Sequence, residues 1–230
     1  MAITTLAFAE MANDTYVDGG ISRLLGEWQL QDLITRDNFH ARAYKHTRAS
    51  LAVVAYRGTV PTSFKDVVVA DLCGIGLSLN ALALNLNTAI DFTGKIKAMY
   101  RDVWLTGHSL GGAYVQLLAA ICELPGYTFN APGVLNLLHQ MSPNLAVRIA
   151  GGLGGGALSV LSRGTTDLIT QVAAGVAGNN GEAILNYRGN FDPVSLVGVH
   201  VGAPLQTIEL VDQKPHVHSM EPIIRTLKGR

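Results

Sequence analysis

Apolar residues recur along the chain with two different spacings. Segments with an apolar residue every three or four positions predict helices, and short apolar runs predict strands. The predicted helices are 4–11, 21–33, 110 to about 123 and one that begins near 222, with an irregular helical stretch over 64–99. The predicted strands are 40–46, 51–56, 103–106, 127–130, 183–187 and 205–210. Strands separated by helices favour an α/β fold with a mixed, mostly parallel sheet flanked by helices.

The organisation of the chain favours one domain over 1–230. The strands at 40–46 and 51–56 are separated by a short turn, which predicts an antiparallel pair. No strand pattern occurs in 133–182, so we expect a helical insertion there, before the strand at 183–187. A Gly-x-Gly-x-x-Ala match lies in this segment, but it follows a helix-like stretch instead of a strand and does not indicate a dinucleotide site.

Composition and charge exclude several classes of protein. The chain has 230 residues, 48% of them hydrophobic, and 17 Lys plus Arg balance 17 Asp plus Glu. Without a basic patch, nucleic acid is not expected as a partner. Cys73 and Cys122 are the two cysteines, so we expect free thiols, no disulfide framework and no thiolate zinc site. No metal and no other cofactor is expected.

The pattern predicts neither a targeting segment nor a membrane span. The first sixteen residues include Glu10 and Asp14 and lack a basic start followed by an apolar core, so we expect no signal peptide. The default expectation is therefore a cytoplasmic location. Export by a route that needs no signal peptide is the alternative. The uncharged run 72–90 contains one serine, one threonine and three asparagines, which argues against a membrane span.

A candidate nucleophile lies between a predicted strand and a predicted helix. The sequence Gly107-His108-Ser109-Leu110-Gly111 fits Gly-x-Ser-x-Gly, the sharp turn that exposes a serine hydroxyl at the end of a strand. Glycines flank such a turn because the strand and helix backbones approach too closely for a β-carbon. A glycine-rich helix start is the structural alternative. The position after the strand 103–106 favours the nucleophile.

A serine nucleophile needs a base, and the base needs an orienting acid. Asp192 follows the strand 183–187, and Pro193 favours an extended conformation at Asp192 that ends the strand. His218 follows the strand 205–210 and precedes the last helix. The order Ser109, Asp192, His218 is that of α/β-hydrolase triads.

Other residues compete for these two roles. Asp212 also follows a strand, but only six positions separate it from His218, too few to bring it behind the imidazole. His216 is the second choice for the base, because it lies two residues from His218. His200 is too near Asp192 in sequence and is expected to pack within its own segment. A metal held by the paired histidines is disfavoured, since no carboxylate or thiol spacing accompanies them.

The oxyanion of an acyl-transfer reaction needs at least two hydrogen-bond donors. The backbone N–H of Leu110, next after the nucleophile, is one candidate. The other is Thr59, which follows the strand 51–56 and can offer both its N–H and its hydroxyl. An ordinary turn after a strand is the alternative for this second position.

Five short blocks together resemble one known family. They are Val54-Ala55-Tyr56-Arg57-Gly58-Thr59, Gly107-His108-Ser109-Leu110-Gly111-Gly112-Ala113, Phe129-Asn130-Ala131-Pro132, Asn190-Phe191-Asp192-Pro193-Val194 and His218-Ser219-Met220. In this order they resemble the class-3 lipases, the fungal-lipase-like branch of the α/β-hydrolases. The resemblance implies a serine esterase acting on acylglycerols or phospholipids, with Ser109, Asp192 and His218 as triad and Thr59 as side-chain oxyanion donor. One departure is Asn130, where the family usually has glycine.

The expected activity is therefore hydrolysis of carboxylic esters, most of all lipid esters, through an acyl-enzyme on Ser109. An acyltransferase or thioesterase with the same triad is the nearest alternative, and a non-catalytic lipid-binding relative is another. The apolar segments 72–90 and 149–162 are candidates for an acyl groove or a mobile cover. We expect a small-molecule or lipid ester as the substrate and transient contact with a lipid surface. The sequence makes no prediction of the oligomeric state.

Overall fold

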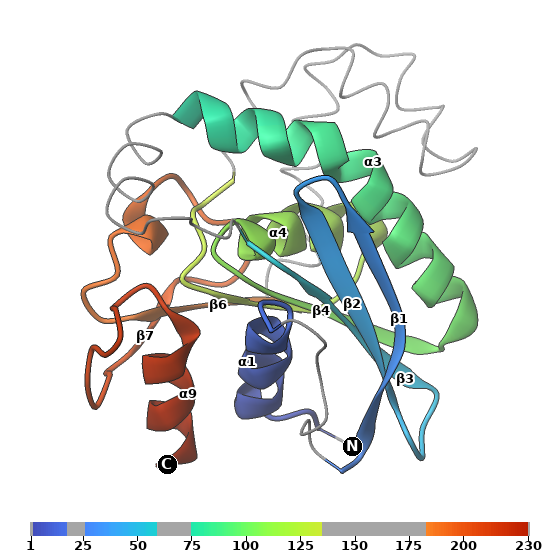
Figure 1. The fold of residues 1–230 in the computed structure, drawn as a ribbon, viewed down its shortest axis with the longest axis horizontal. Helices are drawn as coiled ribbons and strands as arrows, with labels where there is room; N and C mark the ends of the chain where they lie inside the picture. The colour runs from blue at the N-terminus through green and yellow to red at the C-terminus, as the bar shows by residue number, and fades with distance from the viewer. Residues whose placement is uncertain (1, 18–25, 59–74, 135–182, 230) are drawn as a thin grey trace.

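A mixed sheet runs through the centre of the molecule (Figure 1). The computed structural model describes residues 2–17, 26–58, 75–134 and 183–229. The strands of these ranges are β1 (Trp28–Arg36), β2 (Phe39–His46), β3 (Leu51–Tyr56), β4 (Asp102–His108), β5 (Gly126–Phe129), β6 (Ile184–Gly189) and β7 (Gln206–Ile208). They form one sheet in chain order, antiparallel from β1 to β3 and parallel from β3 to β7. The carboxyl ends of the parallel strands therefore meet at one edge.

Helices cover both faces of this sheet (Figure 1). Helices α3 (Ile75–Met99) and α4 (Leu110–Cys122) lie on one face, where the buried cluster includes Leu86, Ile96 and Leu118. Helices α1 (Thr5–Asp14) and α9 (Met220–Lys228) lie on the other face, where Phe8 and Ile223 are buried. Two apolar layers on either side of one sheet give the three-layer arrangement that the sequence predicts.

One predicted helix is wrong. The apolar spacing over 21–33 favours a helix, but within the described residues Trp28–Arg36 is the strand β1, and 21–25 lie outside them. The pairing of β1 with β2 shifts register between Leu30 and Asp32, so a bulge interrupts the two-residue alternation of the strand. Leu30 and Leu33 lie on either side of this bulge, three positions apart as on one face of a helix, and both are exposed. Pairing with β2 decides the conformation at this edge strand.

The other predicted helices and strands agree with those of the structure wherever its residues are described. The strands at 40–46 and 51–56 form the antiparallel pair β2–β3, and the other strands differ from their predicted bounds by a few residues. The predicted insertion over 133–182 lies almost wholly outside the described residues, as does Cys73. Cys122 is a free, half-buried thiol. In the part of the chain that the structure describes, no helix is both long and apolar enough to cross a membrane.

Candidate active site

Ser109 lies in the sharp turn between β4 and α4. Its backbone has φ 56° and ψ −129°, a positive φ that residues with a β-carbon seldom adopt. Although Ser109 is the N-cap residue of α4, its side chain makes no capping hydrogen bond. The hydroxyl is instead directed to a histidine, as described below. This is the conformation that exposes a serine at the carboxyl edge of a parallel sheet.

The glycines on either side of Ser109 are required by close backbone contacts. A β-carbon on Gly107 would overlap the carbonyl group of Gly111. A β-carbon on Gly111 would overlap the carbonyl group of Tyr56 in the neighbouring strand β3. The reason that the sequence suggests for this glycine pattern is therefore confirmed, because strand and helix approach each other at the turn.

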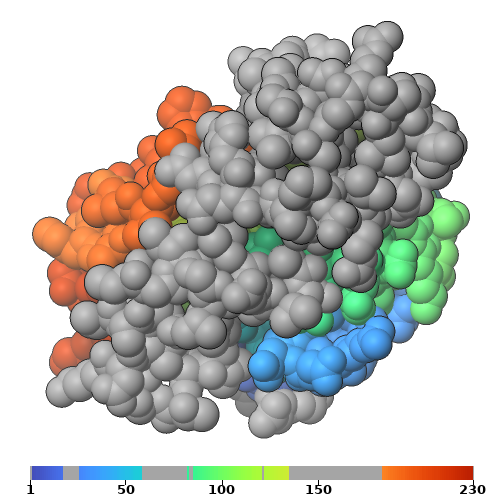
Figure 2. All heavy atoms as spheres, turned by 90° about the horizontal axis from the view of Figure 1, so that it is seen from above, coloured from blue at the N-terminus to red at the C-terminus, as the bar shows by residue number. Residues whose placement is uncertain are grey.

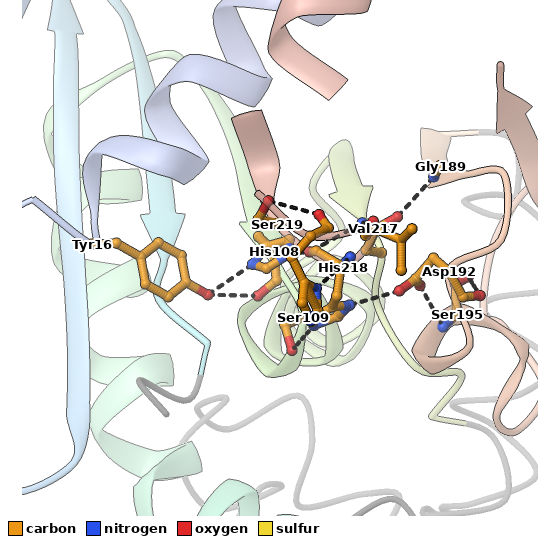
Figure 3. Close-up of polar contacts among 11 residues, drawn as sticks. Tyr16, His108, Ser109, Gly189, Asp192, Ser195, Val217, His218 and Ser219 are labelled. Carbon is orange, nitrogen blue, oxygen red and sulfur yellow. Dashed lines mark hydrogen bonds and ion pairs between the residues drawn. The ribbon is translucent and has the colours of Figure 1, made fainter. Parts of the chain in front are cut away.

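Three side chains from separate loops meet at this turn (Figure 3). The Nε2 atom of His218 lies 2.9 Å from Ser109 Oγ, and its Nδ1 atom lies 2.8 Å from Asp192 Oδ1. Ser109 follows β4, Asp192 follows β6 and His218 follows β7. The structure thus brings together the residues that the sequence predicts as nucleophile, base and acid, although 83 positions separate Ser109 from Asp192.

Asp192 is held as a buried carboxylate. Its side chain has no exposed area. Burial by itself would raise the pKa of Asp192, but its hydrogen bond to His218, the charge of His218 and hydrogen bonds from Ser195 together lower that pKa below its usual range. The N–H of Ser195 donates to Asp192 Oδ2 at 2.9 Å. An ionised carboxylate only accepts, so the proton on the neutral imidazole is at Nδ1, and Nε2 is free to accept from the serine hydroxyl.

The competing candidates have other partners in the structure. Asp212 pairs with Arg225, whose Nε donates to Oδ2 at 3.0 Å. His216 accepts the N–H of His218 at its Nδ1 atom, 3.1 Å away, so it supports the loop of the predicted base. His200 lies with its Nε2 atom 2.8 Å from the carbonyl oxygen of Ser195, within its own segment as expected.

Only part of the predicted oxyanion site falls within the described residues. Leu110 is the first residue of α4, and its N–H has no intrahelical acceptor because of its position. The positive end of the α4 dipole lies at the same N-terminus and favours negative charge there. Thr59 lies outside the described residues, so its role stays a prediction. The preceding residue, Gly58, lies so close to Ser109 that an added β-carbon would be 3.0 Å from Ser109 Cβ.

Sequence reasoning missed the support that His108 and Tyr16 give to the site. His108 is buried, and its Nε2 atom lies 2.6 Å from the carbonyl oxygen of His218. The Tyr16 hydroxyl lies 2.9 Å from His108 Nδ1 and accepts the N–H of Gly58 at 2.9 Å. Burial, and next the charge of His218, lower the pKa of His108 to about 3, so its ring is neutral. No local pattern could reveal Tyr16, since it lies 92 positions from His108.

The donor and the acceptor of each hydrogen bond around His108 and Tyr16 can be assigned. A carbonyl oxygen only accepts, so the proton of the neutral His108 ring is at Nε2 and points to His218. The Tyr16 hydroxyl then donates to His108 Nδ1, while its oxygen accepts from Gly58. Burial raises the pKa of Tyr16 well above its ordinary value, so it remains a donor. The chain of bonds joins the end of β3 to the loop of the predicted base.

Tyr16 is itself held by a buried ion pair at the end of α1. The Arg42 guanidinium donates to the Asp14 carboxylate at 2.7 Å and to the carbonyl of Val17 at 2.8 Å. The Tyr44 hydroxyl also donates to Asp14, at 2.7 Å. Strand β2 therefore fixes the segment that carries Tyr16. Among the described residues, no group of three or more His, Cys, Asp or Glu side chains is arranged to hold a metal ion.

Comparison with known families gives the classification of this chain. Residues 14–152, more than half of the sequence, match the model of a phospholipase-like family described as the Tle-like phospholipase domain. The chain belongs to this Tle-like phospholipase family. The match includes the elbow at Ser109 and the residues Gly58 and His108 beside it.

Curated relatives of this Tle-like chain match over short segments. One, from Candida glabrata and described as "Putative lipase ATG15", is 51% identical over 43 residues, which are 18% of this chain and 8% of that protein. Another of the same description, from Eremothecium gossypii, is 46% identical over 59 residues, 24% of this chain and 11% of that protein. The matches span about a tenth of the length of these relatives.

Solved lipase structures share the fold of the Tle-like chain. The Lip2 lipase of Yarrowia lipolytica superimposes with a TM-score of 0.52 at 13% identity, covering 93% of this chain and 80% of that one. A mutant of MDLA from Penicillium cyclopium gives 0.53 at 15% identity, covering 92% and 83%. These likenesses confirm the predicted α/β-hydrolase fold.

Proposed function

We propose that this chain is a serine hydrolase that cleaves carboxylic esters of lipids through an acyl-enzyme on Ser109. The observation that carries the proposal is the contact of His218 with Ser109 at 2.9 Å and with Asp192 at 2.8 Å. Such spacing is within the reach of proton transfer. Membership of the Tle-like phospholipase family supports the same reaction.

The geometry supports a two-step reaction. Ser109 Oγ bonds to the ester carbonyl carbon while its proton passes to His218 Nε2, and Asp192 stabilises the imidazolium that forms. The N–H of Leu110 donates to the oxyanion, and Thr59 is the proposed second donor. As the C–O ester bond breaks, the leaving alcohol takes the proton from His218. Water then attacks the acyl carbon while its proton passes to His218 Nε2. The bond between Ser109 Oγ and the acyl carbon breaks, Ser109 Oγ takes this proton from His218, and the acid is released.

An apolar surface beside the site supports a lipid as the substrate. Phe191, Leu196 and Val199 lie in the segment between β6 and β7 and are 70%, 63% and 50% exposed. This segment lies on the surface in the view of Figure 2, in orange. Between Gly189 and Gln206 the one charged residue is Asp192, which is buried. A charge-free surface with exposed apolar side chains suits contact with acyl chains.

A fluorophosphonate probe tests the nucleophile. Wild type should be labelled with one equivalent per chain, and Ser109→Ala should not be labelled, because the probe bonds to the activated serine. Mass spectrometry of the labelled peptide identifies the site. Equal labelling of wild type and Ser109→Ala would contradict the assignment of the nucleophile.

A substrate series tests the lipid class. We expect hydrolysis of long-chain acylglycerol and phospholipid esters to exceed that of two-carbon esters, with a rise in rate above the solubility limit of the substrate. Release of fatty acid from phosphatidylcholine and from triacylglycerol, measured side by side, distinguishes the two head-group classes. Highest activity on two-carbon esters, with no rise at the solubility limit, would contradict a lipid substrate.

A further inference from the structure

Asn130 is a buried residue that joins three segments of the candidate active site. It follows β5 and has a positive φ of 47°, and its backbone N–H donates to the carbonyl of Tyr187 at 2.9 Å. Its side-chain Oδ1 accepts the N–H of Gly189 at 2.8 Å. Its Nδ2 lies 3.3 Å from the Val217 carbonyl oxygen and 3.2 Å from that of His218. Every polar atom of this side chain therefore has a partner.

The orientation of this amide is fixed by its partners. Gly189 offers an N–H, which can only donate, so Oδ1 must face it. The carbonyl oxygens of Val217 and His218 can only accept, so the NH₂ group must face them. A single buried amide is thus satisfied in one orientation, which makes Asn130 a rigid bridge.

The bridge reaches both members of the acid–base pair. Gly189 donates its N–H to Asn130 and accepts the N–H of Asp192 at its carbonyl, 3.2 Å away. The carbonyl oxygen of His218 accepts hydrogen bonds from Asn130 Nδ2 and from His108 Nε2. Figure 3 shows Gly189 and Asp192 on one side of this region, with Val217 and His218 beside them. Asp192 and His218 lie on loops after different strands, so their 2.8 Å contact depends on how these loops are held.

We propose that Asn130 is a positioning residue that sets the distance and angle between Asp192 and His218. It touches neither the substrate nor the reacting atoms, and it acts through the backbone of the two loops. A glycine would accept the positive φ but could not make the bridge, whereas asparagine does both. This inference rests on the proposed serine hydrolase function.

The test compares Asn130→Gly with Thr128→Val. Asn130→Gly keeps the backbone conformation and removes the bridge. Thr128 lies on β5, two residues before Asn130, and its hydroxyl donates to Asn186 Oδ1 and not to the loop of His218. Thr128→Val removes this buried hydrogen bond. With a water-soluble ester, we expect kcat to fall about 10- to 100-fold in Asn130→Gly while KM stays within about twofold. Thr128→Val should keep the kcat of wild type.

A second readout separates positioning from general stability. The His218 proton shared with Asp192 should give a downfield ¹H NMR resonance, which Asp192→Asn assigns by its loss. We expect this resonance to shift or broaden in Asn130→Gly and to stay unchanged in Thr128→Val. A wild-type kcat and an unshifted resonance in Asn130→Gly would overturn the inference.

Two further outcomes are distinguishable. If Asn130→Gly does not fold, Asn130→Asp replaces it, because aspartate tolerates the positive φ and keeps an acceptor for Gly189 but loses the donor to His218. Wild-type kcat in Asn130→Asp would equally overturn the inference. A wild-type protein that is neither labelled by fluorophosphonate nor active on esters would instead overturn the proposed function.

Discussion

Ser109 presents its hydroxyl because its backbone takes a conformation that costs energy. A positive φ at a residue with a β-carbon is unfavourable by about 1–3 kcal/mol and persists only where the surroundings enforce it. Here β4 and α4 enforce it from the two sides. In this conformation the Ser109 hydroxyl does not cap α4 and instead hydrogen-bonds to His218.

Tyr16 offers a test at the scale of one hydroxyl group. Tyr16→Phe leaves the Gly58 N–H and His108 Nδ1 without their partner, so we expect the free energy of unfolding to fall by about 1–3 kcal/mol. We also expect kcat to fall several-fold, because Gly58 lies against Ser109. Urea denaturation and steady-state kinetics on a soluble ester measure the two effects.

Tyr44→Phe is the matched control for this variant. Tyr44 donates to Asp14 at the end of the same helix. In Tyr44→Phe the Arg42 guanidinium still donates to Asp14 and to the Val17 carbonyl, so Tyr16 keeps its place. We expect a comparable loss of stability with the kcat of wild type. If both variants lost the same fraction of kcat, the effect of Tyr16 would be one of general stability alone.

The packing of α4 against the sheet depends on the absence of side chains at its first turn. Gly111→Ala would place a β-carbon against the Tyr56 carbonyl of β3, and α4 would have to move away from the strand. We expect the free energy of unfolding to fall by at least about 1–3 kcal/mol, as for other overpacked sites. Esterase activity should fall with it, since Ser109 precedes this turn. Thermal and urea unfolding measure the change.

Gly94→Ala is the corresponding control in a helix that does not form the elbow. Gly94 lies in α3, and an added β-carbon would meet nothing within 4 Å. We expect this variant to be more stable by roughly 0.5–1 kcal/mol, because alanine loses less conformational freedom in a helix. Equal effects of the two substitutions would show that helix propensity, and not contact with β3, governs Gly111.

At the scale of the whole molecule, the buried neutral His108 makes stability depend on pH. Its pKa falls from 6.5 in the unfolded chain to about 3 in the folded protein. Between these values the unfolded state binds a proton that the folded state does not, so stability is complete above pH 6.5 and falls with decreasing pH. The expected slope from this group is about 1.4 kcal/mol per pH unit. Urea denaturation between pH 7 and pH 4 measures it.

His108→Gln isolates this contribution. The pKa values of His200 and His216 are also lowered, but both residues remain in the variant and their effects cancel in the comparison. Asp192 contributes in the same direction only at lower pH, because its ordinary value is 3.8. The variant should lose less stability per pH unit between pH 6 and pH 4. Parallel curves for the two proteins would contradict a neutral His108 in the folded state.

The order of helices and strands could be predicted because it depends on the local spacing of apolar residues and on turn residues. The strands β2 and β3 and the helix α4 follow from apolar runs and from the glycines around Ser109. The strand β1 could not be predicted, since its bulge imitates helical spacing and its conformation comes from pairing with β2. Chain order and loop length favour Asp192 over Asp212 as the acid, and the structure places Asp192 beside the imidazole and Asp212 beside Arg225.

The type of fold and the three side chains that meet follow from local patterns, because a turn, a strand end and an acid–base order can each be recognised in a short stretch of chain. The groups that hold these side chains in place become apparent only in the folded molecule. Tyr16, His108 and Asn130 act through backbone groups that lie far from them along the chain, and a hydrogen bond to a carbonyl or an N–H leaves no pattern in the sequence of its partner. Their contribution becomes visible only when the loops after β4, β5, β6 and β7 are brought together at one edge of the sheet.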